Sequence, residues 1–251
     1  MTSPSHKVAL VTGGGSGIGE ASAFAFARRG MAVAILDKSG ERGSATARDI
    51  REGGGTACFL PADVSKEDEV ADAVSEIIKT YGALHAAHNN AGIPGERKPL
   101  TDLEEEEWET VLSINLKGVW LCMKHEIRVM LEHEVKGAIV NTASTWSFVG
   151  APSAAAYVAS KHGILGLTRT AALEYATKGI RVNAVCPGAT RTPLLRLETQ
   201  TERERELIAS HPMGRLAAPS EIAEAVVWLC SEAASFVTGQ CLIVDGGFLA
   251  R

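Results

Sequence analysis

The chain has 251 residues, of which 45% are hydrophobic and 22% charged, and its formal net charge is -5 at pH 7. This composition is ordinary for a globular protein and fits one large α/β domain or two small ones. Because the chain is acidic overall and has no Lys/Arg cluster, we expect neither nucleic acid nor an anionic membrane as a partner.

The five cysteines are scattered through apolar runs without a C-x-x-C pair, so we expect reduced, buried thiols. They are Cys58, Cys122, Cys186, Cys230 and Cys241. Only a short polar segment precedes the first apolar run. No apolar run reaches the length of about 20 residues that a membrane-spanning helix needs. The sequence therefore predicts a cytoplasmic protein with no signal peptide and no membrane span.

Short apolar runs alternate with helical segments along the whole chain. In chain order we expect strands at residues 7–12, 31–37, 56–61, 84–89, 138–142, 180–186 and 241–245. Helices are expected between them, including one opened by a capping box at 101–104, one over about 115–134, one from Tyr157 to about Thr177 and one over 219–230. This alternation, with strands that are apolar throughout, predicts an α/β fold: a doubly wound parallel sheet of about seven strands with helices on both faces. No linker or repeat divides the chain, so we expect one domain over residues 1–251.

A glycine-rich segment follows the first expected strand. Gly13-x-x-x-Gly17-x-Gly19 stands between a strand and a helix, where backbone amides can meet a pyrophosphate. The glycines permit positive φ and close approach of a ligand. The spacing differs from G-x-G-x-x-G, but the order of strand, loop and helix still favours a phosphate-binding loop over a plain turn.

Asp37 ends the second expected strand, where a carboxylate can accept hydrogen bonds from ribose hydroxyls and repel a 2′-phosphate. This favours NAD over NADP. Lys38 follows directly and could partly offset the repulsion, and no Arg stands in the glycine loop.

Tyr157 and Lys161 lie four residues apart in an Ala-rich segment, so a helix places both on one face. An ammonium one turn away favours the phenolate and lowers the phenol pKa from about 10. The hydroxyl of Ser144 can hold the oxygen that gains or loses the proton. The same spacing also arises by chance, with a half-buried phenol beside a solvated amine. If the pair is functional, it predicts proton transfer to or from an alcohol.

These motifs occur in one order along the chain: the glycine loop, Asn89-Asn90-Ala91-Gly92, Asn115, Ser144, Tyr157-x-x-x-Lys161 and Pro187-Gly188. In this the chain resembles the short-chain dehydrogenase/reductase family, in its branch of about 250 residues, over essentially its whole length. The resemblance implies a Rossmann-type sheet that binds the dinucleotide across the carboxyl ends of its strands. It also implies hydride transfer between a nicotinamide and an alcohol or ketone, with the hydride chemistry supplied by the cofactor.

The resemblance also implies residue roles. Tyr157 would exchange the proton with the substrate oxygen, and Lys161 would lower the pKa of Tyr157 and bind the nicotinamide ribose. Ser144 would orient the substrate, and Asn115 would hold a water that links Lys161 to solvent. With Tyr157 and Lys161, the cofactor-binding residues would be Gly13, Ser16, Gly17, Ile18, Gly19, Asp37, Asp63, Val64, Asn90, Ala91, Gly92, Pro187, Gly188, Thr190 and Thr192. Family members usually have Ile or Val where Thr190 stands, and we expect that change to matter little.

The substrate is less well determined by the sequence. The resemblance places Trp146 and Phe148 at the pocket, with a lid at about residues 191–214 whose Leu194 and Leu195 face it. No fixed cation is evident there, so we expect an uncharged secondary alcohol or ketone, cyclic or aromatic. No metal motif occurs, and all seven histidines are expected to be structural or exposed.

Two other functions compete with an NAD-dependent alcohol dehydrogenase. One is an NADPH-dependent reductase resembling 3-oxoacyl-carrier-protein reductases, which Asp37 opposes. The other is a non-catalytic, cofactor-sensing scaffold, which the intact Ser144, Tyr157 and Lys161 oppose. The resemblance further implies a homotetramer.

Overall fold

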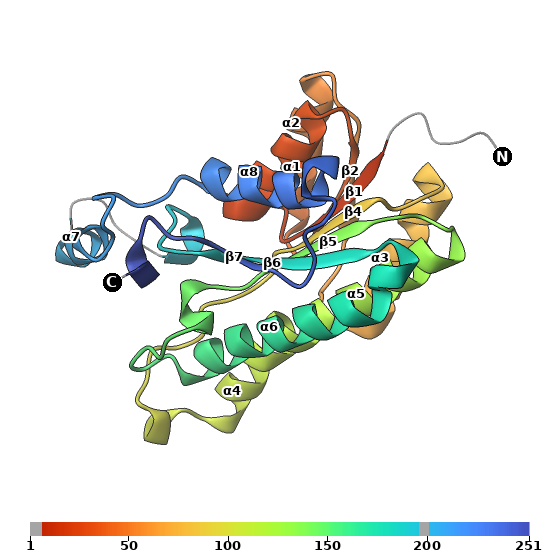
Figure 1. The fold of residues 1–251 in the computed structure, drawn as a ribbon. Coiled ribbons are helices and arrows are strands. Elements are labelled where there is room, and N and C mark those ends of the chain that lie inside the picture. Colours follow the sequence, from red (N-terminus) through yellow and green to blue (C-terminus); the bar gives the residue numbers. More distant parts are fainter. Residues whose placement is uncertain (1–6, 196–200, 251) are drawn as a thin grey trace.

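The computed structural model describes residues 7–195 and 201–250, and its centre is one seven-stranded parallel sheet with the strand order β3-β2-β1-β4-β5-β6-β7 (Figure 1). The strands are β1 Val8–Thr12, β2 Ala32–Asp37, β3 Ala57–Pro61, β4 Ala86–Asn89, β5 Ala138–Thr142, β6 Arg181–Pro187 and β7 Cys241–Val244. The predicted doubly wound sheet is therefore confirmed, and it is Rossmann-like.

The order of the strands reverses between β1 and β4. β1 pairs with β2 on one side, in the register Val8↔Ala32, and with β4 on the other, in the register Ala9↔Ala86. The connections that leave β1 and β4 therefore start from neighbouring carboxyl ends and lead to helices on opposite faces of the sheet. Ligands of open α/β sheets bind at such a point.

Helices cover both faces of the sheet (Figure 1). One face carries α1 Gly17–Arg28, α2 Gly40–Glu52 and α8 Pro219–Cys230, and the other carries α3 Glu67–Tyr81, α5 Gly118–Glu132 and α6 Ala155–Tyr175. Two shorter helices, α4 Glu105–Leu112 and α7 Glu202–Ala209, lie outside these layers. The two aliphatic clusters between sheet and helices form the core that holds the strand ends in place.

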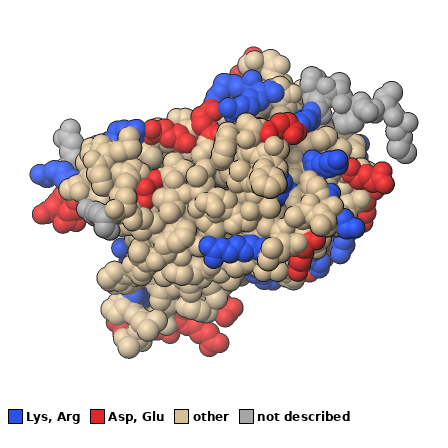
Figure 2. Space-filling model, viewed as in Figure 1, with Lys and Arg blue, Asp and Glu red and all other residues tan. Residues whose placement is uncertain are grey.

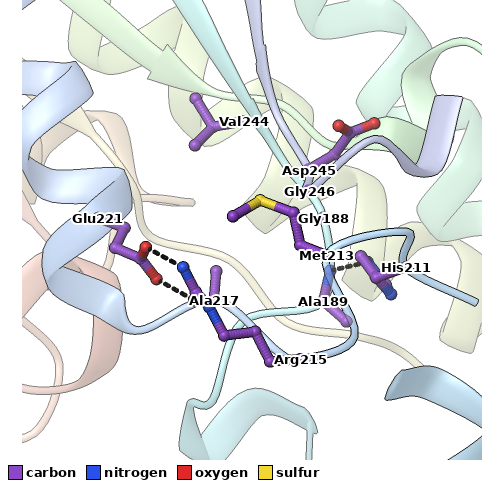
Figure 3. A pocket seen from close by; sticks show the side chains of 10 residues that line it. All are labelled: Gly188, Ala189, His211, Met213, Arg215, Ala217, Glu221, Val244, Asp245 and Gly246. Carbon is purple, nitrogen blue, oxygen red and sulfur yellow. Dashed lines mark hydrogen bonds and ion pairs between the residues drawn. The ribbon is translucent and has the colours of Figure 1, made fainter. Parts of the chain in front are cut away.

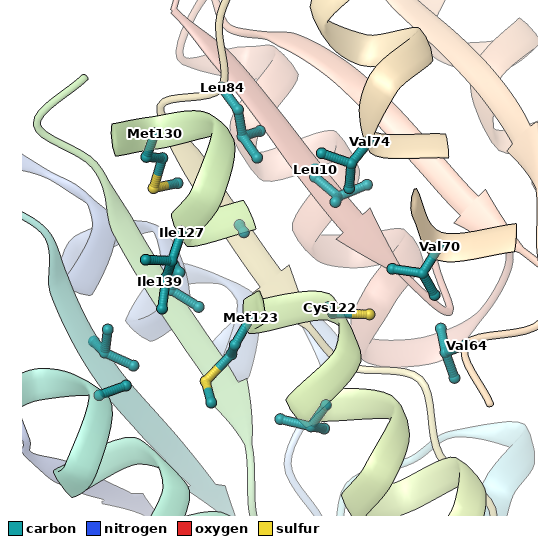
Figure 4. Packing of buried hydrophobic residues seen from close by; sticks show 14 of the residues in the cluster. Leu10, Val64, Val70, Val74, Leu84, Cys122, Met123, Ile127, Met130 and Ile139 are labelled. Carbon is teal, nitrogen blue, oxygen red and sulfur yellow. The ribbon is translucent and has the colours of Figure 1, made fainter. Parts of the chain in front are cut away.

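Figure 4 shows part of the core beneath α3 and α5. Leu10 of β1 lies beside Val74 of α3, and Ile139 of β5 lies beside Ile127 of α5, and all four side chains are at most 6% exposed. Such packing excludes water and fixes the positions of the elements on which the site depends.

A buried polar network joins β4 and β5 to α5 and α6. The amide of Asn89 donates to Glu126 Oε2 and to Asn141 Oδ1, each over 3.0 Å, and the amide of Asn141 donates to Thr168 over 3.0 Å. Burial raises the pKa of Glu126 to about 8, against the lowering effect of the Asn89 hydrogen bond. The acid is therefore protonated near neutrality, and the network adds no buried charge.

Two expectations for residues 101–134 are wrong. The predicted helix start at Thr101 is a 3-10 turn, Leu100–Asp102, and the helix begins after Glu104, whose capping partner is Glu107. The acidic run offers several capping registers, and the sequence pattern does not distinguish among them. The second helix does not start afresh at 115 either, because a π-helical turn, Ser113–Lys117, joins α4 to α5.

None of the described helices is long and apolar enough to cross a bilayer. On the face shown in Figure 2, Lys and Arg side chains are interspersed with Asp and Glu around a broad uncharged area.

Candidate active site

The glycine loop between β1 and α1 has the shape of a phosphate cradle. Gly13 and Gly17 have φ values of +63° and +57°, which disfavour other residues. A Cβ on Gly19 would lie 2.1 Å from the carbonyl oxygen of Gly13. Ser16 precedes the helix with an extended backbone, so the amides of Ile18 and its neighbours in the first turn have no intrahelical acceptor.

The loop after β4 is tied to this cradle. Thr12 Oγ1 accepts hydrogen bonds from the backbone amides of Asn90, over 2.9 Å, and Ala91, over 3.1 Å. The Asn90 side chain donates to the carbonyl oxygens of Thr12 and Gly13, over 3.2 and 3.3 Å. The structure thus brings the predicted Asn90 and Ala91 directly against the glycine loop.

Asp37 is fixed at the end of β2 by two backbone amides. Its Oδ2 accepts from Gly15 over 2.9 Å, and its Oδ1 accepts from Ser39 over 2.8 Å. No ion pair joins its carboxylate to a cation of the described residues. Its negative charge therefore stands uncompensated beside the glycine loop.

Lys38, the residue that the sequence suggested as a partial counterion for Asp37, pairs elsewhere. Its Nζ lies 3.0 Å from Asp63 Oδ2. Burial raises the pKa of Asp63, but hydrogen bonds from Ser65 and the contact with Lys38 outweigh it and lower this pKa to about 2. Val64 turns inward and packs against Gly118, where a Cβ would meet it at 2.9 Å.

Tyr157 and Lys161 stand on one face of α6, as their spacing predicted. Lys161 Nζ lies 5.5 Å from the centre of the Tyr157 ring and donates to the carbonyl oxygen of Thr142 over 2.7 Å. Ser144 follows β5 and reaches the same phenol, which accounts for its effect on the pKa of Tyr157. The structure thus brings together three of the four predicted catalytic side chains, from the turn after β5 and from α6.

The pKa of Tyr157 differs from the expectation. Burial raises it above 10, and the hydrogen bond with Ser144 opposes this rise without cancelling it. Burial also lowers the pKa of Lys161 to about 8, so this amine loses its proton at a lower pH than a solvated lysine does. The expected lowering of the Tyr157 pKa by Lys161 does not appear, and burial, which spacing along a helix does not reveal, decides the direction of the shift.

Asn115 lies in the π-helical turn between α4 and α5. Its Oδ1 accepts from the amide of Ile93 over 2.8 Å, and its Nδ2 donates to the Ile93 carbonyl over 2.9 Å. A Cβ on Gly92 would lie 3.2 Å from Asn115 Oδ1 and 3.8 Å from Lys161 Nζ, so these three residues adjoin. The side chain thus positions the loop after β4, and its role in holding water stays a prediction. Such π-turns are frequent at functional sites.

The turn after β5 forms a wall beside the phenol. Ser147 Oγ donates to the Lys161 carbonyl over 2.7 Å, which pins the turn to α6. The rings of Trp146 and Tyr157 meet edge to face with centroids 5.8 Å apart. Phe148 is 39% exposed, so it lies at the rim, and neither aromatic residue is buried in the core.

Sequence reasoning missed a cation next to this wall. The guanidinium carbon of Arg97, in the loop after β4, lies 5.0 Å from the centre of the Trp146 ring, on an exposed side chain. No signal along the chain could have found it, because it depends on how a long loop folds over a turn some fifty residues away.

The loop after β6 closes the site. Thr192 lies near Gly17, where a Cβ would meet its side chain at 3.1 Å. Thr190 is 4% exposed, and its hydroxyl donates to the carbonyl of Gly188 over 3.0 Å. Ile or Val could not make this hydrogen bond. The Thr190 side chain therefore has a structural role that the sequence analysis did not anticipate.

The predicted lid, residues 191–214, contains a 3-10 turn, Pro193–Leu195, and the helix α7. Leu194 is 39% exposed. Residues 196–200 of the predicted lid lie outside the described residues. Among the residues that the structure describes, no group of His, Cys, Asp or Glu could hold a metal ion.

Comparisons with known proteins found a matching family model, similar enzymes and similar solved structures. A family model described as enoyl-(acyl carrier protein) reductase matches residues 13–249. The chain is 44% identical to 2,5-dichloro-2,5-cyclohexadiene-1,4-diol dehydrogenase of Sphingobium indicum, over 100% of both chains. It is 42% identical to cyclohexanol dehydrogenase of Acinetobacter sp., over 98% of this chain and 96% of the other. Its fold matches 3-ketoacyl-(acyl-carrier-protein) reductase from Brucella melitensis complexed with NADH, with a TM-score of 0.89 and 37% identity over 96% of this chain and 98% of that one.

Proposed function

This chain belongs to the short-chain dehydrogenase/reductase family, and from that premise we propose that it transfers a hydride between NAD(H) and a cyclic secondary alcohol or ketone. One observation carries the proposal: at the carboxyl edge of the sheet the Tyr157 ring has its centre 5.8 Å from that of Trp146 and 5.5 Å from Lys161 Nζ. Two relatives that cover almost the whole chain act, by their names, on cyclic alcohols, which supports the substrate class.

The residues present fit a dinucleotide. Amides in the first turn of α1 have no intrahelical acceptor, and the close approach of Gly19 to Gly13 leaves room only for backbone. These amides would hold the pyrophosphate. The fixed carboxylate of Asp37 would accept the hydroxyls of the adenosine ribose. Gly188, Thr190 and Thr192 would flank the nicotinamide.

The choice of NAD over NADP also belongs to this proposal. Lys38 is bound to Asp63, so the charge of Asp37 has no direct counterion among the described residues. An uncompensated carboxylate at the ribose repels a 2′-phosphate. A relative of known structure that is complexed with NADH is consistent with this choice.

Bound NAD supplies the acceptor of the hydride. The protein's own residues manage the proton on the substrate oxygen. Because burial raises the pKa of Tyr157, the phenol is protonated near neutrality and is suited to give its proton to a ketone oxygen. In the direction of alcohol oxidation the deprotonated form, the Tyr157 phenolate, would take up the proton of the alcohol, and the Lys161 ammonium, charged below about pH 8, would stabilise that phenolate. Ser144 would hold the same oxygen in line.

The substrate class follows from the wall of the site. Trp146 presents its ring beside Tyr157, and a saturated six-membered ring can pack against such an aromatic surface. We therefore expect cyclohexanol and related cyclic secondary alcohols to reduce NAD at a rate well above that of acyclic alcohols of equal size. Steady-state assays that follow NADH formation test this, with NADP and with acyl thioesters as parallel substrates. Activity confined to 3-oxoacyl thioesters and NADPH would establish the reductase alternative instead.

We further propose a homotetramer. Trp120 and Leu131 of α5 and Leu173 of α6 are 43%, 40% and 84% exposed on neighbouring helices, and β7 lies at the open edge of the sheet with Ile243 42% exposed. Burying both surfaces would give the two interfaces of a tetramer with twofold axes. Sedimentation equilibrium should give four times the chain mass of 26.5 kDa. A single species of one chain mass at micromolar concentration would contradict this.

The cytoplasm remains our proposed compartment. The five cysteines form no disulfide, and Cys122, Cys186 and Cys241 are buried, as expected of thiols kept reduced.

A further inference from the structure

His211 lies between the helix α7 and the loop after β6. It follows the end of α7 by two residues and is 5% exposed. Its Nδ1 lies 2.7 Å from the carbonyl oxygen of Leu207, in the last turn of α7. Its Nε2 accepts a hydrogen bond from the backbone amide of Ala189 over 3.1 Å, the contact drawn as a dashed line in Figure 3.

These two partners fix the state of the ring. The amide of Ala189 can only donate, so Nε2 must be an unprotonated acceptor. The carbonyl of Leu207 can only accept, so Nδ1 carries the proton. The imidazole is therefore one defined neutral tautomer with a partner at each end, and it packs on the ring of Phe248 with centroids 5.3 Å apart.

The Ala189 amide belongs to a peptide group that is held at both ends. Its other end, the carbonyl of Gly188, accepts the hydroxyl of Thr190 over 3.0 Å. A Cβ on Gly188 would lie 2.9 Å from His211 Nε2, so the ring approaches the backbone as closely as glycine allows. With both ends bound, this peptide cannot rotate without losing two buried hydrogen bonds.

A second contact joins the helix α7 to the same loop. Arg191, two residues after Ala189, reaches Glu204 of α7 over 2.6 Å, and the Glu204 side chain is only 8% exposed. The lid helix is thus attached to the loop after β6 by one ion pair and by the imidazole of His211.

We propose that His211 is a positioning residue: it sets the Gly188–Ala189 peptide for the nicotinamide and transmits the position of α7 to it. The proposal rests on the proposed function, because it takes the loop after β6 to be part of the cofactor site. His211 does not touch the reacting atoms. Its effect passes through the orientation of the loop, so it should appear in cofactor affinity before it appears in the chemical step.

Two matched variants separate the two ends of the ring. In His211→Asn the amide nitrogen takes the place of Nδ1, which keeps the bond to Leu207 and removes the acceptor for Ala189. In His211→Gln the amide oxygen takes the place of Nε2, which keeps the acceptor for Ala189. Both variants lose the ring packing on Phe248, so a general loss of stability affects them alike.

The experiment measures NADH affinity by fluorescence titration and exchange of the Ala189 amide by hydrogen–deuterium exchange, in the full-length chain. We expect His211→Asn to raise the Kd for NADH and the KM for NAD about tenfold, since it leaves a buried donor unpaired. Its Ala189 amide should exchange faster, whereas His211→Gln should stay within about threefold of the parent in affinity. In His211→Asn, kcat should fall by a smaller factor than the affinity for NADH.

Other results decide against the proposal. Equal NADH affinity and equal exchange at Ala189 in both variants and the parent would overturn it, and so would equal losses in both variants. If the parent protein itself fails to bind NADH, the proposed function falls instead, while the exchange rates at Ala189 still report on the hydrogen bond.

Discussion

Tyr157→Phe should lower kcat/KM for alcohol oxidation by about a thousandfold, while NADH still binds with nearly the parent affinity. The variant removes only the hydroxyl and keeps the ring that packs edge to face on Trp146. General acid–base catalysis by one positioned group contributes about 10²- to 10⁴-fold. The phenol oxygen is the group placed to exchange the proton, and neither Ser144 nor Lys161 can take over that exchange.

The measurement pairs steady-state rates with NADH fluorescence titration. The pairing separates an enzyme from a cofactor-sensing scaffold, because a sensor would show no turnover to lose. Trp146→Phe is the matched control: it alters the partner ring and keeps the phenol, so it should change KM for the cyclic substrate and leave the proton step in place. Turnover by Tyr157→Phe within tenfold of the parent would refute the role of Tyr157.

Asp37→Asn should raise the ratio of kcat/KM for NADP to that for NAD by about a hundredfold. The carboxylate is fixed by the amides of Gly15 and Ser39 and has no cationic partner among the described residues. Two charges about 4 Å apart near a protein surface interact by about 4 kcal/mol before screening, so removing one of them admits the 2′-phosphate. Asn keeps one oxygen as an acceptor, which preserves the shape of the loop better than Ala.

The control is a variant with the same change of net charge at an exposed position of α2. Glu41→Gln removes one negative charge from the exposed first turn of α2 and leaves the hydrogen bonds of Asp37 in place. It should leave the ratio for the two cofactors within about twofold of the parent. If Asp37→Asn behaves like Glu41→Gln, the carboxylate does not select the cofactor.

Much of the fold could be predicted from local pattern. The strand at Ala138–Thr142 and the helix at Pro219–Cys230 begin and end where the apolar run and the Pro-Ser-Glu start place them. Parallel strands that are buried on both faces appear in the sequence as continuous apolar runs. The glycines of the loop stand at positions where a positive φ or a close backbone contact excludes other residues.

What escaped prediction depends on contacts between distant segments. Arg97 meets Trp146 only because a loop folds over a turn, and His211 meets Ala189 only because the lid returns to β6. The π-helical turn at Asn115 and the raised pKa of Tyr157 likewise arise from packing. A single sequence carries residue type and spacing, and neither states which side chain loses its water.

A crystal structure with NAD and cyclohexanol tests the central claim most directly. The account predicts that the Tyr157 hydroxyl lies within about 3.2 Å of the alcohol oxygen, on the nicotinamide side of the Trp146 ring, with Ser144 on the same oxygen. A bound alcohol whose oxygen lies beyond hydrogen-bond reach of Tyr157, with the phenol turned away from the nicotinamide, would contradict it.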